Sequence, residues 1–214
     1  MVIRAYSIGI FPMASRRDDP SVHWVAPQMR GILPLTGFHV PRRLRRMLRG
    51  GRFQVTCDQD FGQVIRGCAR PRHGHPETWI NAEIIRVFDE LHHLGHAHSV
   101  EVRRDGALVG GVYGLALGAA FFGESMFSTE PDASKVALVH LVARLRLGGF
   151  MLLDVQFVTD HLRQFGAIEI PATRYLQSLD DALRRPARFY SDPTGDSLGS
   201  ALESLFSQSS TQTS

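Results

Sequence analysis

Asp154 and Gln156 are the two residues in this sequence whose types and spacing are best suited to joint chemistry. They lie in the apolar run MLLDVQFV, which reads as a strand, and side chains two apart on a strand project from the same face. Leu153, Val155 and Phe157 are then expected to face the core, with the carboxylate and the amide together on the other side. A carboxylate beside an amide on a buried strand indicates a polar site rather than a solvated edge.

A second carboxylate, Glu124, lies in the segment FFGESMFS, with apolar residues on both sides. Its neighbour Ser125 is not part of the GxSxG turn of serine hydrolases, and no histidine is fixed beside it as a base. Covalent catalysis through Ser125 is therefore the weaker hypothesis. The plainer interpretation of Glu124 and Asp154 is that each pairs with an arginine, and the residue pattern alone leaves that alternative open.

Arginine supplies nearly all of the positive charge. Lys135 is the one lysine among the 24 basic residues, and the net charge is +3. Six arginines fall within the short stretch PRRLRRMLRGGR, namely Arg42, Arg43, Arg45, Arg46, Arg49 and Arg52. The guanidinium fork matches phosphate, so a cluster of this kind can hold an RNA backbone. The alternative is a solvated helix face with Leu44, Met47 and Leu48 turned inward, and the sequence alone does not separate the two.

The bulk composition describes a globular protein with one main core and room for a small accessory lobe. The chain has 214 residues, of which 43% are hydrophobic and 21% are charged. No apolar run approaches the ~20 residues needed to span a bilayer. Pro12 interrupts the short apolar pieces at the N-terminus, which argues against a signal peptide. Cys57 and Cys68 form neither a CxxC pair nor a disulfide framework, so we expect a cytoplasmic protein.

The elements that must position these residues alternate between strand and helix patterns. Periodicity and turn formers predict strands at Phe53–Cys57, His98–Arg103, Ala107–Leu117, Met151–Val158 and Ile168–Pro171. They predict helices at Phe61–Cys68, from Asn81 to about Gly95, from Asp132 to about Leu147, at His161–Phe165 and at Tyr175–Arg184. The polar composition from Ser191 onward predicts a disordered tail, apart from one turn of helix at Leu202–Phe206.

A cluster of histidines and a run of glycines are the patterns that would indicate a metal or nucleotide site. The segment LHHLGHAHS contains His92, His93, His96 and His98, but Gly95 ends the helix before a metal-binding i, i+4 pair is secured. With no HExxH motif and no nearby cysteine, we expect no metal ion here. The glycines of VGGVYGLALG match neither a Walker loop nor GxGxxG, and in a strand they favour a bulge or a close backbone approach.

Eight motifs, in order and spacing, resemble the leucyl/phenylalanyl-tRNA–protein transferase family. They are IGIFPMA, GCARPRHGHPETWI, LHHLGHAHSVE, LVGGVYG, FFGESMFS, DASKVALVHL, LLDVQFVTDHL and FGAIEIP, and they cover about Tyr6 to Leu179. The resemblance implies a bacterial cytoplasmic enzyme that transfers Leu or Phe, and Met less well, from aminoacyl-tRNA to the N-terminal Lys or Arg of acceptor proteins. The product would be marked for degradation through the bacterial N-degron pathway. A monomer without cofactor or membrane association is also implied.

The fold implied by the resemblance is α+β. A small N-terminal domain, residues 1–33, is expected to precede an acetyltransferase-like (GNAT) domain, residues 34–190, with a mixed, mostly antiparallel sheet. Residues 191–214 are expected to form the disordered tail. The chain starts almost at the IGIFP motif, whereas relatives usually carry a further N-terminal segment. Two explanations are open: an abbreviated small domain or a misassigned start codon.

The resemblance also assigns roles to individual residues. Asp154 and Gln156 are the implied catalytic pair, with Asp154 assisting removal of a proton from the attacking amine directly or through Gln156. Because an ordinary Asp is a weak base near neutral pH, charge stabilisation and orientation compete with that role. The implied substrate-binding residues are Glu124, Ser125, Phe121, Val112, Leu138 and Leu153 around the amino acid, and Tyr6, Met13 and Trp79 around the 3′ adenosine. The implied tRNA-binding residues are Arg42, Arg43, Arg45, Arg46 and Arg49.

The sequence departs from the family pattern at three positions. Met13 stands where a Trp often follows FP, Arg103 replaces a frequent Trp, and Ala172 occupies the place of an Arg. Two other functions fit parts of the sequence, namely a GNAT enzyme that uses acyl-CoA and a tRNA-binding protein without catalysis. The first needs a pyrophosphate-binding loop, and STEPDASK occupies that place instead. The second would be marked by loss of Asp154 or Gln156, and both residues are present.

Overall fold

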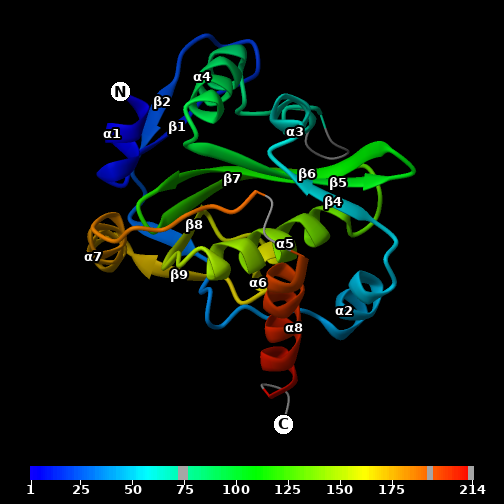
Figure 1. The fold of residues 1–214 in the computed structure, drawn as a ribbon. Helices are drawn as coiled ribbons and strands as arrows, with labels where there is room; N and C mark the ends of the chain where they lie inside the picture. The colour runs from blue at the N-terminus through cyan, green and yellow to red at the C-terminus, as the bar shows by residue number, and fades with distance from the viewer. Residues whose placement is uncertain (72–76, 192–194, 212–214) are drawn as a thin grey trace.

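A seven-stranded mixed sheet organises the computed structural model, which describes residues 1–71, 77–191 and 195–211 (Figure 1). Helices pack on both faces of this sheet, so the chain forms three layers. In sheet order the strands are β4 (Gln54–Cys57), β5 (Ala97–Arg104), β6 (Ala107–Leu117), β7 (Ala120–Ser128), β8 (Leu152–Gln156), β3 (Met29–Ile32) and β9 (Ile168–Pro171). The predicted α+β class with a mixed, mostly antiparallel sheet is confirmed.

One parallel pair interrupts the otherwise antiparallel sheet. β7 runs parallel to β8 only where Ala120–Phe122 lies against Leu152–Asp154. Beyond that point β7 stays paired with β6 as far as Ser128, whereas β8 stays paired with β3. The two strands therefore part after Phe122 and Asp154, and the sheet opens between them.

The glycines of β6 allow close backbone approach, as the sequence predicts. The register between β6 and β7 shifts between Tyr113 and Gly114, which marks a bulge. A Cβ atom on Gly114 would lie 2.2 Å from the backbone oxygen of Phe122 and 2.4 Å from the ring of Phe121. Only glycine fits at this position, because the obstructing oxygen belongs to the paired backbone.

Helices cover both faces of the sheet. α3 (Phe61–Cys68) and α4 (Ala82–His93) lie on one face, and α5 (Ala133–Leu147) lies on the other (Figure 1). α4 begins as predicted, because Asn81 Oδ1 accepts a hydrogen bond from the Ile84 N–H at 2.8 Å. Further helices are α2 (Arg42–Arg49), α6 (Asp160–Arg163) and α7 (Ala172–Leu183). Within the described residues, no helix combines the length and the apolar character needed to cross a bilayer.

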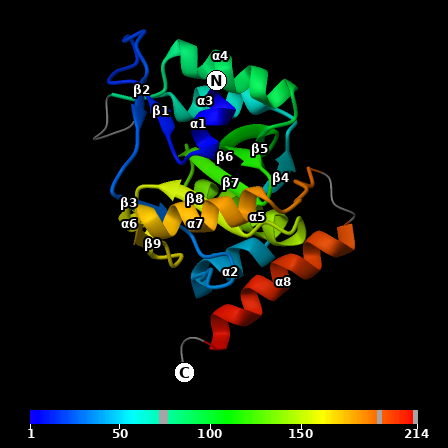
Figure 2. The ribbon, with the colours of Figure 1, turned by 90° about the vertical axis from the view of Figure 1, so that its left-hand side faces the viewer.

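A small N-terminal unit packs beside α4 and α7 (Figure 2). It consists of α1 (Val2–Ser7) and an antiparallel pair, β1 (Phe11–Met13) and β2 (His23–Val25), which is separate from the main sheet. β3 does not belong to this unit, because it lies between β8 and β9 in the main sheet. The boundary predicted after residue 33 therefore falls one strand too late. Sequence order hides this, since β3 directly follows the small unit but pairs with strands from the C-terminal half of the chain.

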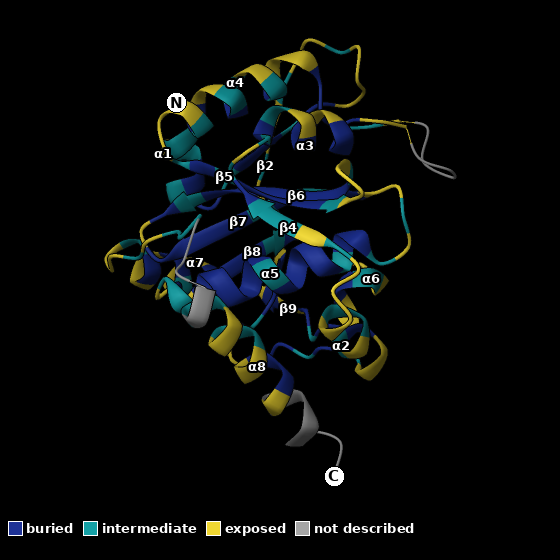
Figure 3. Cartoon of the chain, turned by 45° about the vertical axis from the view of Figure 1, so that its right-hand side comes forward, coloured by how far each residue is buried: buried dark blue, intermediate teal, exposed yellow. Residues whose placement is uncertain are grey.

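The C-terminal segment forms helix α8 (Gly195–Thr211), which packs against α5. Leu205 and Phe206 are buried in the core, and Figure 3 shows α8 with a buried side and an exposed side. The turn of helix predicted at Leu202–Phe206 is part of this helix, and the prediction of disorder is wrong for the rest of residues 195–211. Leu198, Leu202 and Leu205 recur at helical spacing, and the surrounding serines and glutamines obscure this stripe in the composition.

Candidate active site

A cavity of about 610 Å³ opens where β7 and β8 part. Its inner wall consists of apolar side chains from the sheet and α5: Val112, Leu138, Leu141 and Leu153 are buried, and Met126 is half-buried. More exposed residues form its rim, which we define as Met13, Trp79 and Phe157. The polar side chains that reach it include Glu124, Ser125, Gln156, Thr159 and His161. The cavity thus joins an apolar interior to a small polar region.

Most of the predicted catalytic and substrate-binding residues line this one cavity. They are Val112, Leu138, Leu153, Glu124, Ser125, Gln156, Met13 and Trp79. Tyr6, Phe121 and Asp154 are not among the residues that line it, and each is fully buried. The structure therefore separates residues able to touch a bound molecule from residues that act from behind the cavity wall.

Glu124 is a buried carboxylate whose hydrogen-bond partners are uncharged. Its Oε1 accepts a hydrogen bond from Tyr6 Oη at 2.8 Å and another from Gln156 Nε2 at 3.2 Å. Burial raises the pKa of the Glu124 carboxyl from 4.5 to about 8; the Tyr6 hydrogen bond opposes this rise and the nearby charge of Asp154 adds to it. The prediction that Glu124 pairs with an arginine is not matched. Glu124 can instead take up or release a proton near neutral pH.

Asp154 lies beneath the cavity and pairs with a buried arginine, Arg30. Arg30 Nε lies 3.0 Å from Asp154 Oδ1 and Nη2 lies 2.7 Å from Oδ2, so the guanidinium contacts both carboxylate oxygens. Tyr175 Oη donates a third hydrogen bond to Oδ2 at 2.6 Å. Asp154 is 0% and Arg30 is 1% exposed, so the ion pair is closed to solvent. The prediction that Asp154 pairs with an arginine is confirmed.

Arg30 connects Asp154 to the N-terminal unit. Its Nη1 donates to the backbone oxygen of Gly9 at 3.0 Å, and its guanidinium carbon lies 4.4 Å from the ring centre of Phe11 and 4.6 Å from that of Tyr175. Although burial opposes its charge, the Asp154 hydrogen bonds and charge raise the pKa of Arg30. No motif in the sequence marks Arg30 or Tyr175 as a site residue. The available signal was a charged residue within QMRGIL, a run that reads as a strand.

Gln156 has a left-handed backbone, with φ of 56°. This conformation is uncommon for a residue other than glycine and occurs often at functional sites. The Gln156 N–H donates to Asp154 Oδ1 at 2.8 Å, and the next N–H, of Phe157, donates to the Val155 oxygen at 2.6 Å. Asp154 therefore fixes the backbone turn that places the Gln156 side chain in the cavity.

The end of β8 departs from the strand alternation that the sequence predicts. Leu153 and Val155 line the cavity, whereas Asp154 points to the other side and meets Arg30. The turn at Gln156 then breaks the alternation, so Gln156 returns to the cavity side. Phe157 is 46% exposed. The predictions that Asp154 and Gln156 share one face and that Phe157 faces the core are wrong, because the strand ends at Gln156.

Comparisons with known proteins identify the family of this chain. The family model described as leucyl/phenylalanyl-tRNA protein transferase matches residues 32–180, and the model for the N-terminal domain of the same proteins matches residues 1–28. The chain belongs to the leucyl/phenylalanyl-tRNA–protein transferase family. It is therefore an aminoacyltransferase. The match to the N-terminal family model ends at residue 28 and the match to the main family model begins at residue 32, so β3 lies at the boundary between them.

Similar proteins of this family span almost the same length. A leucyl/phenylalanyl-tRNA–protein transferase of Paramagnetospirillum magneticum is 62% identical over 189 residues, which is 88% of this chain and 90% of that protein. One from Rhodopseudomonas palustris strain TIE-1 is 58% identical over 193 residues, or 90% of this chain and 86% of that protein. A solved structure of the C-terminal domain of a putative lysylphosphatidylglycerol synthetase from Agrobacterium fabrum covers 75% of this chain and 52% of that chain. It is 16% identical with a TM-score of 0.39, too low to establish a shared fold.

Tyr6 and Phe121 lie behind the cavity of this family member rather than in it. Tyr6 is 0% exposed, meets the ring of Phe122 edge-on at 4.9 Å, and reaches Glu124 through its hydroxyl. Phe121 is also 0% exposed and packs against Phe150 at 6.1 Å between ring centres. The contacts of Tyr6 fit support of Glu124 better than contact with an adenosine, and those of Phe121 fit the core.

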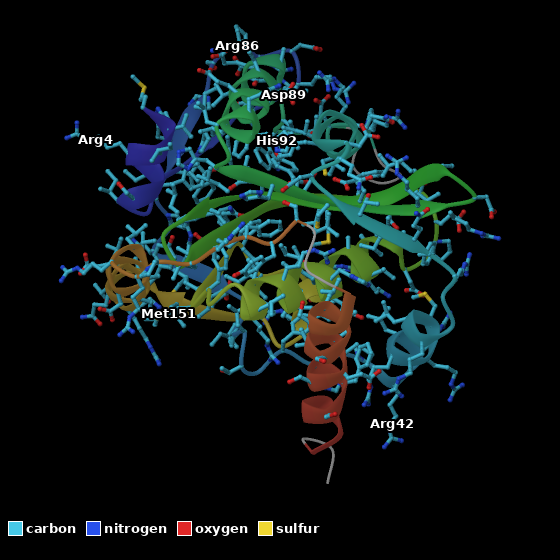
Figure 4. The ribbon with its side chains drawn as sticks, in the orientation of Figure 1. Arg4, Arg42, Arg86, Asp89, His92 and Met151 are labelled. Carbon is cyan, nitrogen blue, oxygen red and sulfur yellow. The ribbon has the colours of Figure 1, made fainter. Side chains whose placement is uncertain are left out.

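The arginines of α2 divide into two groups. Arg42, Arg43 and Arg46 are exposed, and Figure 4 shows Arg42 extending from α2 at the edge of the molecule. Arg45 Nη1 instead donates to the Phe206 oxygen of α8 at 2.8 Å. Arg49 forms an ion pair with Glu203 of α8 at 2.7 Å. Two of the five predicted tRNA-binding arginines therefore already contact the C-terminal helix.

Two histidines of the segment LHHLGHAHS, His92 and His98, approach the same carboxylate, Asp58, with Nδ1 at 4.0 Å and 2.8 Å from its oxygens. His92 stacks on Phe61 at 4.4 Å between ring centres, and His93 Nδ1 lies 2.6 Å from the Asp89 oxygen. Among residues 1–71, 77–191 and 195–211, no group of three or more His, Cys, Asp or Glu side chains is placed to hold a metal ion.

Proposed function

We propose that this chain transfers Leu or Phe, and Met less well, from aminoacyl-tRNA to the N-terminal Arg or Lys of acceptor proteins. The observation that carries the proposal is the cavity between β7 and β8, in which an apolar interior meets Gln156 and Glu124. The membership of this chain in the transferase family supports the same reaction. We also propose a GNAT-like domain, because one parallel pair parts around the cavity in an otherwise antiparallel sheet.

The apolar interior suits the amino-acid side chain. Val112, Leu138 and Leu153 are each at most 2% exposed and line the cavity. A volume of about 610 Å³ lies in the ~300–1,000 Å³ range usual for small-molecule sites. An apolar wall of this kind separates side chains that differ by one methylene by only ~1–3 kcal/mol. Leu and Phe are therefore both expected to bind, and Met is expected to bind less well.

The reaction needs an oriented amine more than an activated carbonyl. The amine nitrogen attacks the ester carbon, the bond from that carbon to the tRNA ribose oxygen breaks, and the proton lost by the amine ends on the released oxygen. Because the ester is already activated, orientation of the amine and the ester supplies most of the rate acceleration. Orientation alone can lower the activation barrier by ~7–11 kcal/mol. We assign the contact with the amine and ester to the Gln156 side chain, which lies in the cavity.

Glu124 is the better placed of the two carboxylates to accept a proton. It lines the cavity, and burial raises its pKa to about 8. A protein α-amino group has a pKa of ~7.7–8.0, so proton transfer between the two groups is nearly balanced. Asp154 is closed off by Arg30 and Tyr175, which supports action through Gln156 and not direct contact with the amine.

The tRNA is assigned to the rim and to α2. Met13 and Trp79 at the rim are proposed to contact the 3′ adenosine, and the exposed arginines Arg42, Arg43 and Arg46 the phosphates. A cytoplasmic monomer that marks its products for N-degron degradation, without a cofactor, is part of the same proposal.

Transfer of radiolabelled leucine from Leu-tRNA to a peptide that begins with Arg tests the proposal. A peptide of the same sequence that begins with Ala is the acceptor control, and Gln156→Ala is the enzyme control. We expect labelled product only from the wild-type protein with the Arg peptide. Equal labelling of the Ala peptide would overturn the acceptor assignment, and full activity of Gln156→Ala would remove Gln156 from the mechanism.

A further inference from the structure

Phe157 is a large aromatic residue that the fold leaves at the rim of the cavity. Its side chain is 46% exposed and lines the cavity together with Trp79 and Met13. Phe157 is not an isolated surface side chain, because it continues the apolar surface of the cavity, and an apolar groove of this kind marks a ligand-binding site. The reaction itself gives Phe157 no assigned role.

The backbone holds Phe157 in this position. The left-handed Gln156, with φ of 56°, and the 2.6 Å hydrogen bond from the Phe157 N–H to the Val155 oxygen turn the chain sharply at the end of β8. Gly31 of the neighbouring strand permits the turn, because a Cβ there would lie 2.9 Å from the Phe157 carbonyl carbon. The ring is therefore placed by two backbone constraints and not by a flexible loop.

Phe11 steadies the ring without enclosing it. The two ring centres lie 5.8 Å apart at an interplanar angle of 77°, which is an edge-to-face contact. Such a contact fixes the tilt of the Phe157 ring and leaves aromatic surface free toward the rim. The free surface is thus available to a planar, apolar group entering with the substrate.

We propose that Phe157 binds the terminal nucleobase of the aminoacyl-tRNA by stacking, and so helps to set the affinity for the nucleoside end of the substrate. This rests on the proposed function. If the amino-acid side chain occupies the apolar interior and Gln156 contacts the ester, the nucleoside must lie on the rim side of Gln156. Phe157 is the next residue in the chain and lies on that side. Stacking on an aromatic ring suits any base, because every base has a π-face.

A pair of small substrates separates base stacking from other contacts. One is phenylalanyl-adenosine, and the other is a phenylalanyl ester of ribose that lacks the base. Phe157→Leu keeps an apolar side chain but removes the ring, and Phe157→Trp restores an aromatic surface. Met151→Ala is the matched control, since Met151 is 51% exposed, lies just before the opposite end of β8, and does not line the cavity (Figure 4).

We expect Phe157→Leu to raise KM for phenylalanyl-adenosine about 10-fold with little change in kcat, which corresponds to the loss of one stacked base. Phe157→Trp should retain the wild-type KM, and Met151→Ala should leave it unchanged. KM for the base-free ester should be the same in all variants. An equal rise with the base-free ester, or a rise confined to the acceptor peptide, would overturn the proposal by assigning Phe157 to another group.

A binding measurement keeps the inference separate from the proposed reaction. The probe is the amide analogue of phenylalanyl-adenosine, in which the ester oxygen is replaced by nitrogen, and its Kd is measured by calorimetry. Wild-type protein that binds this probe but transfers nothing would contradict the proposed function, and a Kd about 10-fold weaker in Phe157→Leu would still support stacking. Equal Kd values for the two proteins, or no binding by wild type, would overturn the role of Phe157.

Discussion

Glu124 and Asp154 are both buried carboxylates, yet their partners differ in charge. Arg30 contacts both oxygens of Asp154, whereas the partners of Glu124 are the hydroxyl of Tyr6 and the amide of Gln156. An adjacent guanidinium favours the charged form of a carboxyl group, whereas neutral hydrogen-bond donors in a buried site favour it less. The two acids therefore suit different tasks: Asp154 accepts the hydrogen bond of the Gln156 N–H, and for Glu124 we propose proton exchange.

Replacement of Arg30 tests whether the ion pair with Asp154 stabilises the fold. Arg30→Met is expected to lower the free energy of unfolding by about 3–5 kcal/mol, because it leaves the Asp154 carboxylate buried without its cation. Urea denaturation monitored by tryptophan fluorescence gives this value. The double variant Arg30→Met with Asp154→Leu should regain much of the lost stability but not the transfer activity. A double variant as unstable as the single one would contradict the ion-pair account.

The raised pKa of Glu124 predicts a specific pH dependence of stability. Its pKa is about 8 in the folded protein and near 4.5 when exposed, so between those values the folded state holds a proton that the unfolded state has released. The contribution of Glu124 to the unfolding free energy therefore falls as pH rises from about 4.5 to about 8, with a limiting slope of about 1.4 kcal/mol per pH unit. Denaturation of wild type and Glu124→Gln at pH 5, 6, 7 and 8 measures it. Parallel curves for the two proteins would contradict the shifted pKa.

At the scale of the elements, the packing of α8 beside α2 determines which α2 arginines can contact RNA without disturbing another helix. Arg45 and Arg49 contact α8, and Arg49 also lies over the Phe206 ring at 5.3 Å. Reversing the charge of either residue would disturb the docking of α8 as well as any RNA contact. Charge reversal at Arg42, Arg43 and Arg46 therefore tests phosphate binding without disturbing these contacts with α8.

Charge reversal at Arg42, Arg43 and Arg46 should weaken tRNA binding and reduce its salt dependence. If each arginine contacts one phosphate, the slope of log K against log salt concentration falls by about 2–3 in magnitude. Filter binding at several salt concentrations measures the slope. Arg86→Glu on α4 is the control, since Arg86 and Arg42 lie at opposite ends of the molecule (Figure 4). An unchanged slope would favour the solvated-face interpretation of α2.

At the scale of the whole molecule, the sequence predicts the bounds of several helices and strands but not the contacts between residues far apart in the chain. The bounds of β6, β9 and α3 follow from the sequence, because alternation, helical spacing and the Asp105–Gly106 turn are local signals. The partner of Asp154 could not be named, since Arg30 lies 124 residues away in the chain. The left-handed Gln156 was equally hidden, because its conformation depends on the Asp154 hydrogen bond and not on its residue type.

The C-terminal helix contributes to the stability of the whole fold. Phe206 is 5% exposed and belongs to the core that includes α5, so Phe206→Ala is expected to lower the free energy of unfolding by about 3–5 kcal/mol. Glu203→Ala in the same helix should cost less than about 1 kcal/mol, because the Glu203 side chain is 58% exposed in its ion pair. Thermal or urea denaturation compares the two variants. Equal effects would mean that α8 is not anchored by its apolar side.

The place of β3 between β8 and β9 has a consequence for biosynthesis. β4 to β7 pair with their neighbours in sequence, so this meander can form while the rest of the chain is still being translated. β3 can pair with β8 only after residue 156 has been made and with β9 only after residue 171, about 7–28 s after residue 32 at ~5–20 residues per second. The hydrogen bonds of Arg30 to Asp154 and its contact with the Tyr175 ring cannot form before β8 and α7 have been made. We therefore expect the ion pair beneath the cavity to form after the meander of β4 to β7.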